Sequence, residues 1–211
     1  MQRRSLITNI IRLKSLNKIK NLNYLKMSYS KILDLENNLK EILSSRKIPV
    51  WDELPEIDLY MDQVLSLLEH YLGIYYEMAD SQKFITASMI NNYVKLNIIP
   101  APQKKKYSKS HIAYLLIVCT LKQTLDMATI KKILPLTDNE EEIKTIYTSF
   151  IKNQRKSYDY VTDNVRKIAD PLLEFEGDNP ERINDLVLQV ASTANVFKIL
   201  TERITKLTEE E

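Results

Sequence analysis

The sequence predicts a mostly α-helical protein, and three observations support this fold class. Only two of its 211 residues, Gly73 and Gly177, are glycine, whereas average usage of about 7% would give roughly 15. All seven prolines fall where the apolar periodicity breaks, so they mark the ends of elements. Between the prolines, apolar residues recur three and four positions apart, which is the spacing of one helix face.

The same composition excludes several classes of function. Two glycines are too few for a glycine-rich phosphate loop, a dinucleotide-binding fingerprint or a glycine-flanked nucleophile. His70, His111 and Cys119 do not form a Cys/His zinc motif, so we expect no metal, no cofactor and no enzymatic activity. Cys119 lies in an apolar run typical of a core, and no run reaches the about 18 residues of a membrane span. We therefore expect a cytoplasmic protein.

Charge is divided into blocks along the chain, although the net charge is only +2. Residues 1–26 hold seven Lys/Arg and no acid, and residues 81–137 hold nine bases and one acid. The segments 27–80 and 138–211 are acidic. A basic block within an acidic chain is typical of a surface that contacts a polyanion. The alternative is a solvated lysine face.

The first 49 residues are expected to precede the main domain. Residues 1–26 have neither the features of a secretion signal nor those of a packed domain, so we interpret them as a poorly ordered basic extension. Met27 opens a segment typical of a protein start, which leaves open whether 1–26 belong to the native chain. The alternative is a basic arm that touches membrane or nucleic acid. Residues 27–49 predict an N-terminal helix.

The central domain, residues 50–136, is expected to begin with a helix over 58–72. A second helix is predicted over 86–96, capped by Thr86. Asn97 should end it, because asparagine adopts the left-handed conformation more readily than other residues with a side chain. Four polar residues share its outer face, opposite an apolar inner stripe: Ser88, Asn91, Asn92 and Lys95.

A basic loop follows this helix. Two prolines make residues 100–102 extended, and the lysine-rich loop 103–107 ends at Tyr107. We expect these residues to form a short hairpin, a small β-wing. Two more helices follow, capped by Ser108 and Asp126.

The C-terminal residues 137–211 predict a long two-helix hairpin. Apolar residues alternate four and three apart over 139–169 and again over 180–208, and Pro171 is expected to end the first helix. A repeat of 3.5 residues is typical of coiled-coil packing. We therefore expect a homodimer through both helices, the alternative being that they pack only on each other.

This order of elements is that of a winged helix-turn-helix domain. Asn91 and Asn92 can each match an adenine edge in the major groove, while lysines of the helix end and the wing would neutralise phosphates. The candidate DNA-binding residues are Ser88, Asn91, Asn92, Lys95, Lys104, Lys105, Lys106 and Lys109.

Residues 84–134 resemble the DNA-binding domain of MerR-type regulators. Met89–Lys95 corresponds to the recognition helix, Ile99-Pro100 to a Leu-Pro segment and Tyr107 to the tyrosine that ends the wing. Asp126–Ile130 corresponds to the start of the last helix. The resemblance implies a MerR-like winged helix-turn-helix fold and a dimeric regulator of transcription that binds double-stranded DNA.

The preceding segment, Trp51–Val64, is similar to a bacterial family built on that plan, the domain of unknown function 1836. Two departures from the MerR pattern are Asn97 in place of a glycine and Asn91 in place of an arginine. The cysteines of metal-sensing members are absent, so no metal response is carried over.

We therefore expect a sequence-specific DNA-binding transcriptional regulator, with 86–96 in the major groove and 103–107 on the phosphate backbone. The alternative is a non-enzymatic protein-interaction module that uses the winged helix and the hairpin as a scaffold. His111, in the first turn of its helix, is expected to face solvent or phosphate. A small-molecule effector is compatible with the sequence, but nothing in it identifies one.

Overall fold

The computed structural model describes residues 48–73, 75, 84–173 and 181–207, together with Asp34, Asn37, Asn38 and Glu41. The chain divides into two units, one spanning 42–159 and 197–211 and the other 1–41 and 160–196. The expected extension over 1–26 and nearly all of the expected helix over 27–49 lie outside the described residues.

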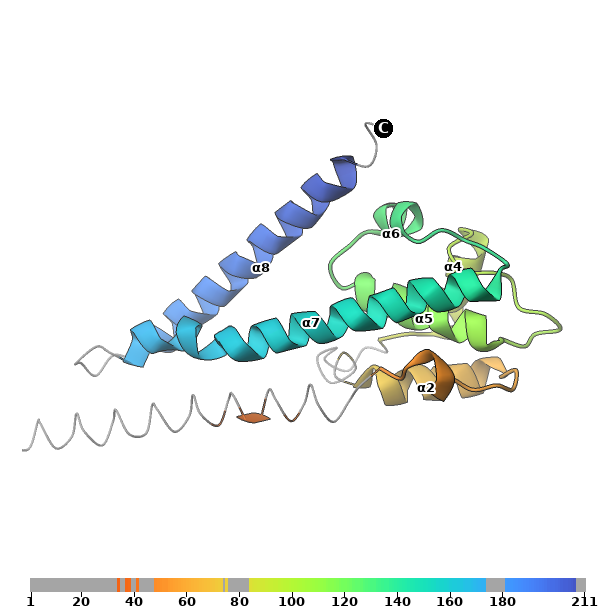
Figure 1. Ribbon diagram of the computed structural model, residues 1–211, viewed down its shortest axis with the longest axis horizontal. Helices are drawn as coiled ribbons and strands as arrows, with labels where there is room; N and C mark the ends of the chain where they lie inside the picture. Colours follow the sequence, from red (N-terminus) through yellow and green to blue (C-terminus); the bar gives the residue numbers. More distant parts are fainter. Residues whose placement is uncertain are drawn as a thin grey trace, which may run out of the picture. The chain divides into compact units, whose positions relative to one another are not determined.

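The prediction of a mostly helical chain is confirmed (Figure 1). In chain order the elements are the 3-10 helix η1 (Trp51–Glu53) and the α-helices α2 (Met61–Tyr71), α4 (Ala87–Lys95), α5 (Lys109–Leu121), α6 (Met127–Ile133), α7 (Glu140–Leu173) and α8 (Glu181–Leu207). None of the helices within the described residues combines the length and the hydrophobicity that a membrane span requires.

The predicted small β-wing is wrong, since the described residues contain no strand. They contain two isolated bridges, which join Gln103 to Lys106 and Leu59 to Tyr107. A longer hairpin would next pair Pro102 with Tyr107, but proline has no amide hydrogen. Both backbone groups of Tyr107 instead bond to Leu59, at N–O distances of 2.8 and 2.9 Å. The winged helix-turn-helix fold is therefore corrected to a helical domain that carries a single tight turn.

The same bridge changes the start of the first helix in the domain. The sequence places that helix over 58–72, whereas α2 begins at Met61. Leu59 is 8% exposed and extended against Tyr107, so it cannot enter a helix. The physical cause is a contact across 48 positions of the chain, which apolar spacing alone does not reveal.

The hydrophobic core of the 42–159 unit is built around α5. Every residue of α5 from His111 to Cys119 is buried, so this helix is covered on all sides. A helix that is apolar all round is stable only in such a position. Side chains from the surrounding helices cover it: Val64, Leu68, Ile90, Tyr93, Ile130, Ile143, Tyr147 and Ile151. The first turns of α7 therefore belong to this core, which continues past position 136.

Two buried tyrosines tie α5 and α7 to neighbouring chain segments. The Tyr147 hydroxyl donates to the Pro49 carbonyl oxygen at 2.8 Å, and its ring lies edge-on to Trp51 at 6.1 Å. The Tyr114 hydroxyl donates to the Pro135 carbonyl at 2.8 Å and accepts from the Thr137 amide at 3.1 Å. These bonds satisfy polar groups that would otherwise be costly to bury.

The two long helices expected near the C-terminus are present, with differences. α7 continues through Pro171 to Leu173, where the sequence predicted a stop. Its first turn is capped by Asn139, whose side-chain oxygen accepts from the Glu141 amide at 3.0 Å. In α8, every described side chain is exposed except that of Thr205.

The Tyr147 hydrogen bond provides a test of this packing. Tyr147→Phe keeps the ring but leaves the buried Pro49 carbonyl without its partner, so it should lower the free energy of unfolding by about 1–2 kcal/mol. Urea unfolding measures the change. Tyr160→Phe is the matched control, since Tyr160 is 58% exposed. Equal stabilities of the two variants would contradict the assigned role of the hydroxyl.

Candidate nucleic-acid interface

Helix α4 separates apolar from polar side chains as the sequence predicted. Ile90 and Tyr93 are buried, at 0% and 4% exposure. The four residues expected on the outer face are all exposed: Ser88, Asn91, Asn92 and Lys95. Thr86 caps the helix, its hydroxyl accepting from the Met89 amide at 3.3 Å.

The end of α4 is fixed by a Schellman motif. Asn97 has a φ of 52°, so the predicted left-handed residue is confirmed. The Ile98 amide donates to the Tyr93 carbonyl and the Asn97 amide to the Val94 carbonyl, both at 3.0 Å. Ile98 and Ile99 then re-enter the core, at 2% and 1% exposure. The direction in which the chain leaves α4 is therefore set by backbone bonds and by burial.

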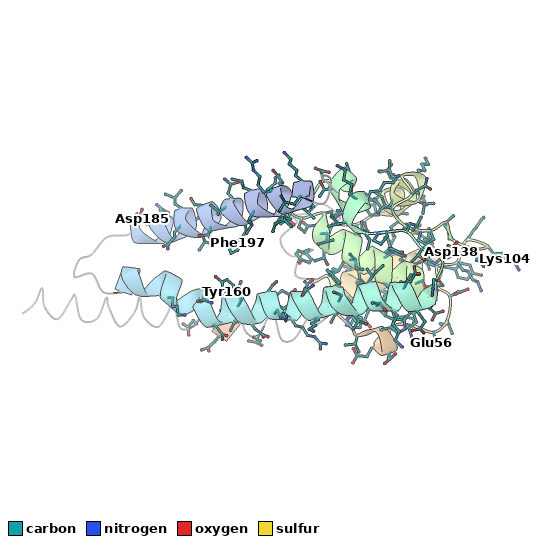
Figure 2. All side chains as sticks on the ribbon, turned by 45° about the horizontal axis from the view of Figure 1, so that its top comes forward. Glu56, Lys104, Asp138, Tyr160, Asp185 and Phe197 are labelled. Carbon is teal, nitrogen blue, oxygen red and sulfur yellow. The ribbon has the colours of Figure 1, made fainter. Side chains whose placement is uncertain are left out.

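The turn 103–106, here called the lysine turn, has an unusual backbone. Gln103 and Lys106 exchange two backbone hydrogen bonds, of 3.1 and 2.8 Å. Lys104 and Lys105 between them both have positive φ, 47° and 63°. Such a turn favours Asn-Gly, and a residue with a side chain pays about 1 kcal/mol or more in this conformation. Both lysines are exposed, and Figure 2 shows Lys104 pointing away from the helices.

His111 holds the base of the lysine turn. Its Nδ1 accepts from the Ser108 amide at 3.1 Å, and its Nε2 donates to the Ala101 carbonyl at 3.2 Å. Only the neutral ring can make both bonds, because Nδ1 must be free of a proton. His111 is 6% exposed, so the expectation that it faces solvent or phosphate is wrong. The His111 and Tyr107 rings meet edge to face, with centroids 5.6 Å apart and an interplanar angle of 84°.

Two of the predicted DNA-binding lysines, Lys106 and Lys109, contact other side chains of the protein. Lys109 forms a salt bridge with Glu56 and lies over the Trp51 ring, 5.3 Å from its centroid. Its side chain is only 11% exposed. Lys106 lies 5.1 Å from the centroid of the Tyr60 ring. Within the part of the chain that the structure describes, the ammonium groups of Lys104 and Lys105 have no ion-pair partner, whereas that of Lys109 is paired.

One basic residue near α4 was not found from the sequence. The Lys131 ammonium, on α6, donates to the Leu96 carbonyl at 2.8 Å. It thereby places a positive charge at the C-terminal end of α4, where the helix dipole is negative. The position of Lys131 in the last turn of its helix was visible, but its carbonyl partner lies 35 residues earlier.

The single acid of residues 81–137, Asp126, is used in the structure itself. Its carboxylate accepts from the Thr129 amide at 2.8 Å and caps α6, as predicted. This hydrogen bond lowers the pKa of the Asp126 carboxyl. The Asp126 carboxylate thus caps the N-terminus of α6. Residues 81–137 contribute no other acid to the surface formed by α4 and the lysine turn.

The distance along the chain limits how far the lysine turn lies from α4. Lys104 follows Asn97 by seven positions, and an extended chain over seven positions spans at most about 25 Å. One helical turn of DNA rises about 34 Å. The outer face of α4 and the lysine turn are therefore close enough to contact one duplex.

The residues that the structure describes contain no group of three His, Cys, Asp or Glu side chains that could hold a metal ion. Burial raises the pKa of the Cys119 thiol to about 12, so the thiol stays protonated at neutral pH. Cys119 is 0% exposed, which confirms the prediction that it is a core residue.

Comparison with known proteins identifies the domain that holds these elements. A family model described as a domain of unknown function (DUF1836) matches residues 49–150. A DUF1836 domain is therefore present in the chain, as the resemblance of Trp51–Val64 implied. It extends from the carbonyl of Pro49, bonded by Tyr147, into α7. No curated protein and no solved structure matches the chain.

The buried ring of His111 predicts a dependence of stability on pH. Burial lowers the pKa of His111 below its ordinary value of 6.5, against smaller opposing effects of the Ala101 carbonyl and Asp58. The unfolded chain therefore binds the proton more readily, and the free energy of unfolding should fall as the pH drops below 6.5. One such group contributes a slope of at most about 1.4 kcal/mol per pH unit.

Urea unfolding between about pH 7 and pH 5 measures this slope, because most carboxylates titrate lower. His111→Gln should remove the contribution, whereas His70→Gln, at an exposed position, should retain it. If His111→Gln leaves the slope of unfolding free energy against pH unchanged, the neutral His111 ring does not hold the lysine turn.

Proposed function

We propose that the protein is a sequence-specific DNA-binding regulator of transcription. The outer face of α4 contacts base edges in the major groove, and the lysine turn contacts the phosphate backbone. The observation that carries the proposal is the pair Lys104–Lys105. Both residues are exposed at the tip of a turn whose backbone is costly for them. Strain at an exposed, cationic tip favours a functional role over a structural one.

The side chains of α4 support the role in base recognition. Asn91 and Asn92 are exposed, and their side-chain amides have no hydrogen-bond partner in the part of the chain that the structure describes. Each amide therefore keeps one donor and one acceptor for the N6 and N7 edge of adenine. Ser88, one turn earlier, is short enough to let the helix enter a groove about 12 Å wide.

The cations around α4 support the role in phosphate binding. Lys95 lies in its last turn, and Lys131 is bonded to the carbonyl of Leu96. Residues 81–125 contain no acid, so nothing within this stretch would repel a phosphate. Lys109 is left out of the proposed contact because it is paired with Glu56.

Removal of the two tip charges tests the proposal. Lys104→Glu/Lys105→Glu should weaken binding to a mixed-sequence duplex and lower the slope of log K against log salt by about 2, one for each phosphate contact. Fluorescence anisotropy of a labelled duplex at several salt concentrations measures both quantities. Lys167→Glu/Lys198→Glu makes the same change of charge at exposed positions outside the surface. If both double variants bind alike, the lysine turn is not the contact.

Self-association through α8 forms the second part of the proposal. Five of its exposed apolar residues lie on the 3.5-residue repeat and are 48–66% exposed: Val190, Phe197, Leu200, Ile204 and Leu207. A stripe of this kind is typical of a helix that packs on another. A twofold dimer would present two copies of α4 to two half-sites of one duplex. The same stripe supports the alternative, a protein-interaction module that binds a different partner.

A measurement of the oligomeric state distinguishes a homodimer through α8 from a module that binds a different protein. Leu200→Glu/Ile204→Glu places two charges in the stripe and should convert the dimer to a monomer, as measured by sedimentation equilibrium. Glu202→Gln, on the side of α8 away from the stripe, should leave the dimer intact. A wild-type protein that is monomeric at all concentrations would overturn the dimer and favour the interaction module.

A further inference from the structure

A pocket of about 330 Å³ lies between η1 and the middle of α7. Both walls belong to the unit that spans 42–159. One wall is Trp51 with its neighbour Val50, and the other is one side of α7, from Thr148 to Asp159. The volume is in the range of small-molecule sites, which begin at about 300 Å³. Neither the DUF1836 match nor the proposed DNA contact assigns a role to it.

The α7 wall is strongly basic. Lys152, Arg155 and Lys156 line the pocket at positions i, i+3 and i+4, with Asp159 as the acid among the lining residues. All three cations are exposed, and none has an ion-pair partner in the described residues. Like charges at this spacing repel one another and destabilise a helix. An anion in the pocket would relieve the repulsion.

Apolar side chains line the pocket beside these cations. Trp51 is 6% exposed and Ile151, on the α7 wall, is 5% exposed, so each presents only a small part of its surface to the pocket. The Trp51 ring lies edge-on to the Tyr147 ring at a centroid distance of 6.1 Å, and the Lys109 ammonium lies over it, 5.3 Å from its centroid. A fixed aromatic side chain facing three cations suits a ligand with two parts, one anionic and one flat and apolar.

We propose that this pocket binds a small organic phosphate. The Arg155 guanidinium provides a fork that matches two phosphate oxygens, and Lys152 and Lys156 supply the remaining positive charge. The apolar part of the ligand lies against Trp51 and Ile151. The proposal does not depend on DNA binding, because the pocket residues are separate from α4 and from the lysine turn.

Trp51 makes the test direct, because it is the only tryptophan of the chain. Its fluorescence in the full-length protein should change saturably on titration with phenyl phosphate. Arg155→Gln removes the charged fork and should raise the dissociation constant about tenfold. Lys167→Gln, on α7 but outside the pocket, should leave it unchanged. Benzoate should bind more weakly, since a carboxylate carries less charge than a phosphate monoester.

Several results would overturn the proposal. Inorganic phosphate that binds as tightly as phenyl phosphate would show that the apolar wall is not used. An equal loss of affinity in Arg155→Gln and Lys167→Gln would show that only overall charge matters. If duplex DNA changes the Trp51 emission through Arg155 while phenyl phosphate does not, the cations form a nucleic-acid contact instead. Urea unfolding of Arg155→Gln, whose side chain is exposed, checks that the variant is folded.

Discussion

The burial of α5 on every side is the constraint on which the rest of the structure depends. Residues His111–Cys119 have no polar face to offer water, so other segments must surround them. α2, α4, α6 and the first turns of α7 do so, each with one apolar stripe. A helix that packs its apolar face against α5 exposes its opposite face to solvent. The exposure of Asn91 and Asn92 is therefore a consequence of packing the core.

Five lysines of the basic block fall into two groups according to what their ammonium groups contact. Lys109, Lys122 and Lys131 bond to protein groups, the last two to the backbone carbonyls of Phe84 and Leu96 at 2.9 and 2.8 Å. Partial burial lowers the pKa of Lys122. Lys104 and Lys105 project from a turn fixed at its base by the His111 ring. The first group stabilises the domain, and the second is available to a polyanion.

The sequence predicted local features well and distant contacts poorly. The cap at Thr86, the left-handed Asn97 and the apolar stripe of α4 depend on residues within one or two turns, so spacing and residue type sufficed. The β-wing failed because Tyr107 pairs with Leu59, and the salt bridge of Lys109 was not predicted because its partner Glu56 lies 53 residues away. His111 was expected at the surface because its hydrogen bonds to the Ser108 amide and the Ala101 carbonyl cannot be read from the sequence. The pocket beside Trp51 could not be predicted either, because its lining residues come from segments about 100 positions apart in the chain.

We propose that the outer face of α4 and the lysine turn together form a surface for duplex DNA. Mapping of backbone amide chemical shifts in the labelled protein, with and without a DNA duplex, tests it most directly at a mass of 24.7 kDa. If this surface contacts the duplex, the largest changes lie in Ala87–Asn97 and in residues 103–106. Changes confined to α7 or α8, or none at saturating duplex, would contradict it.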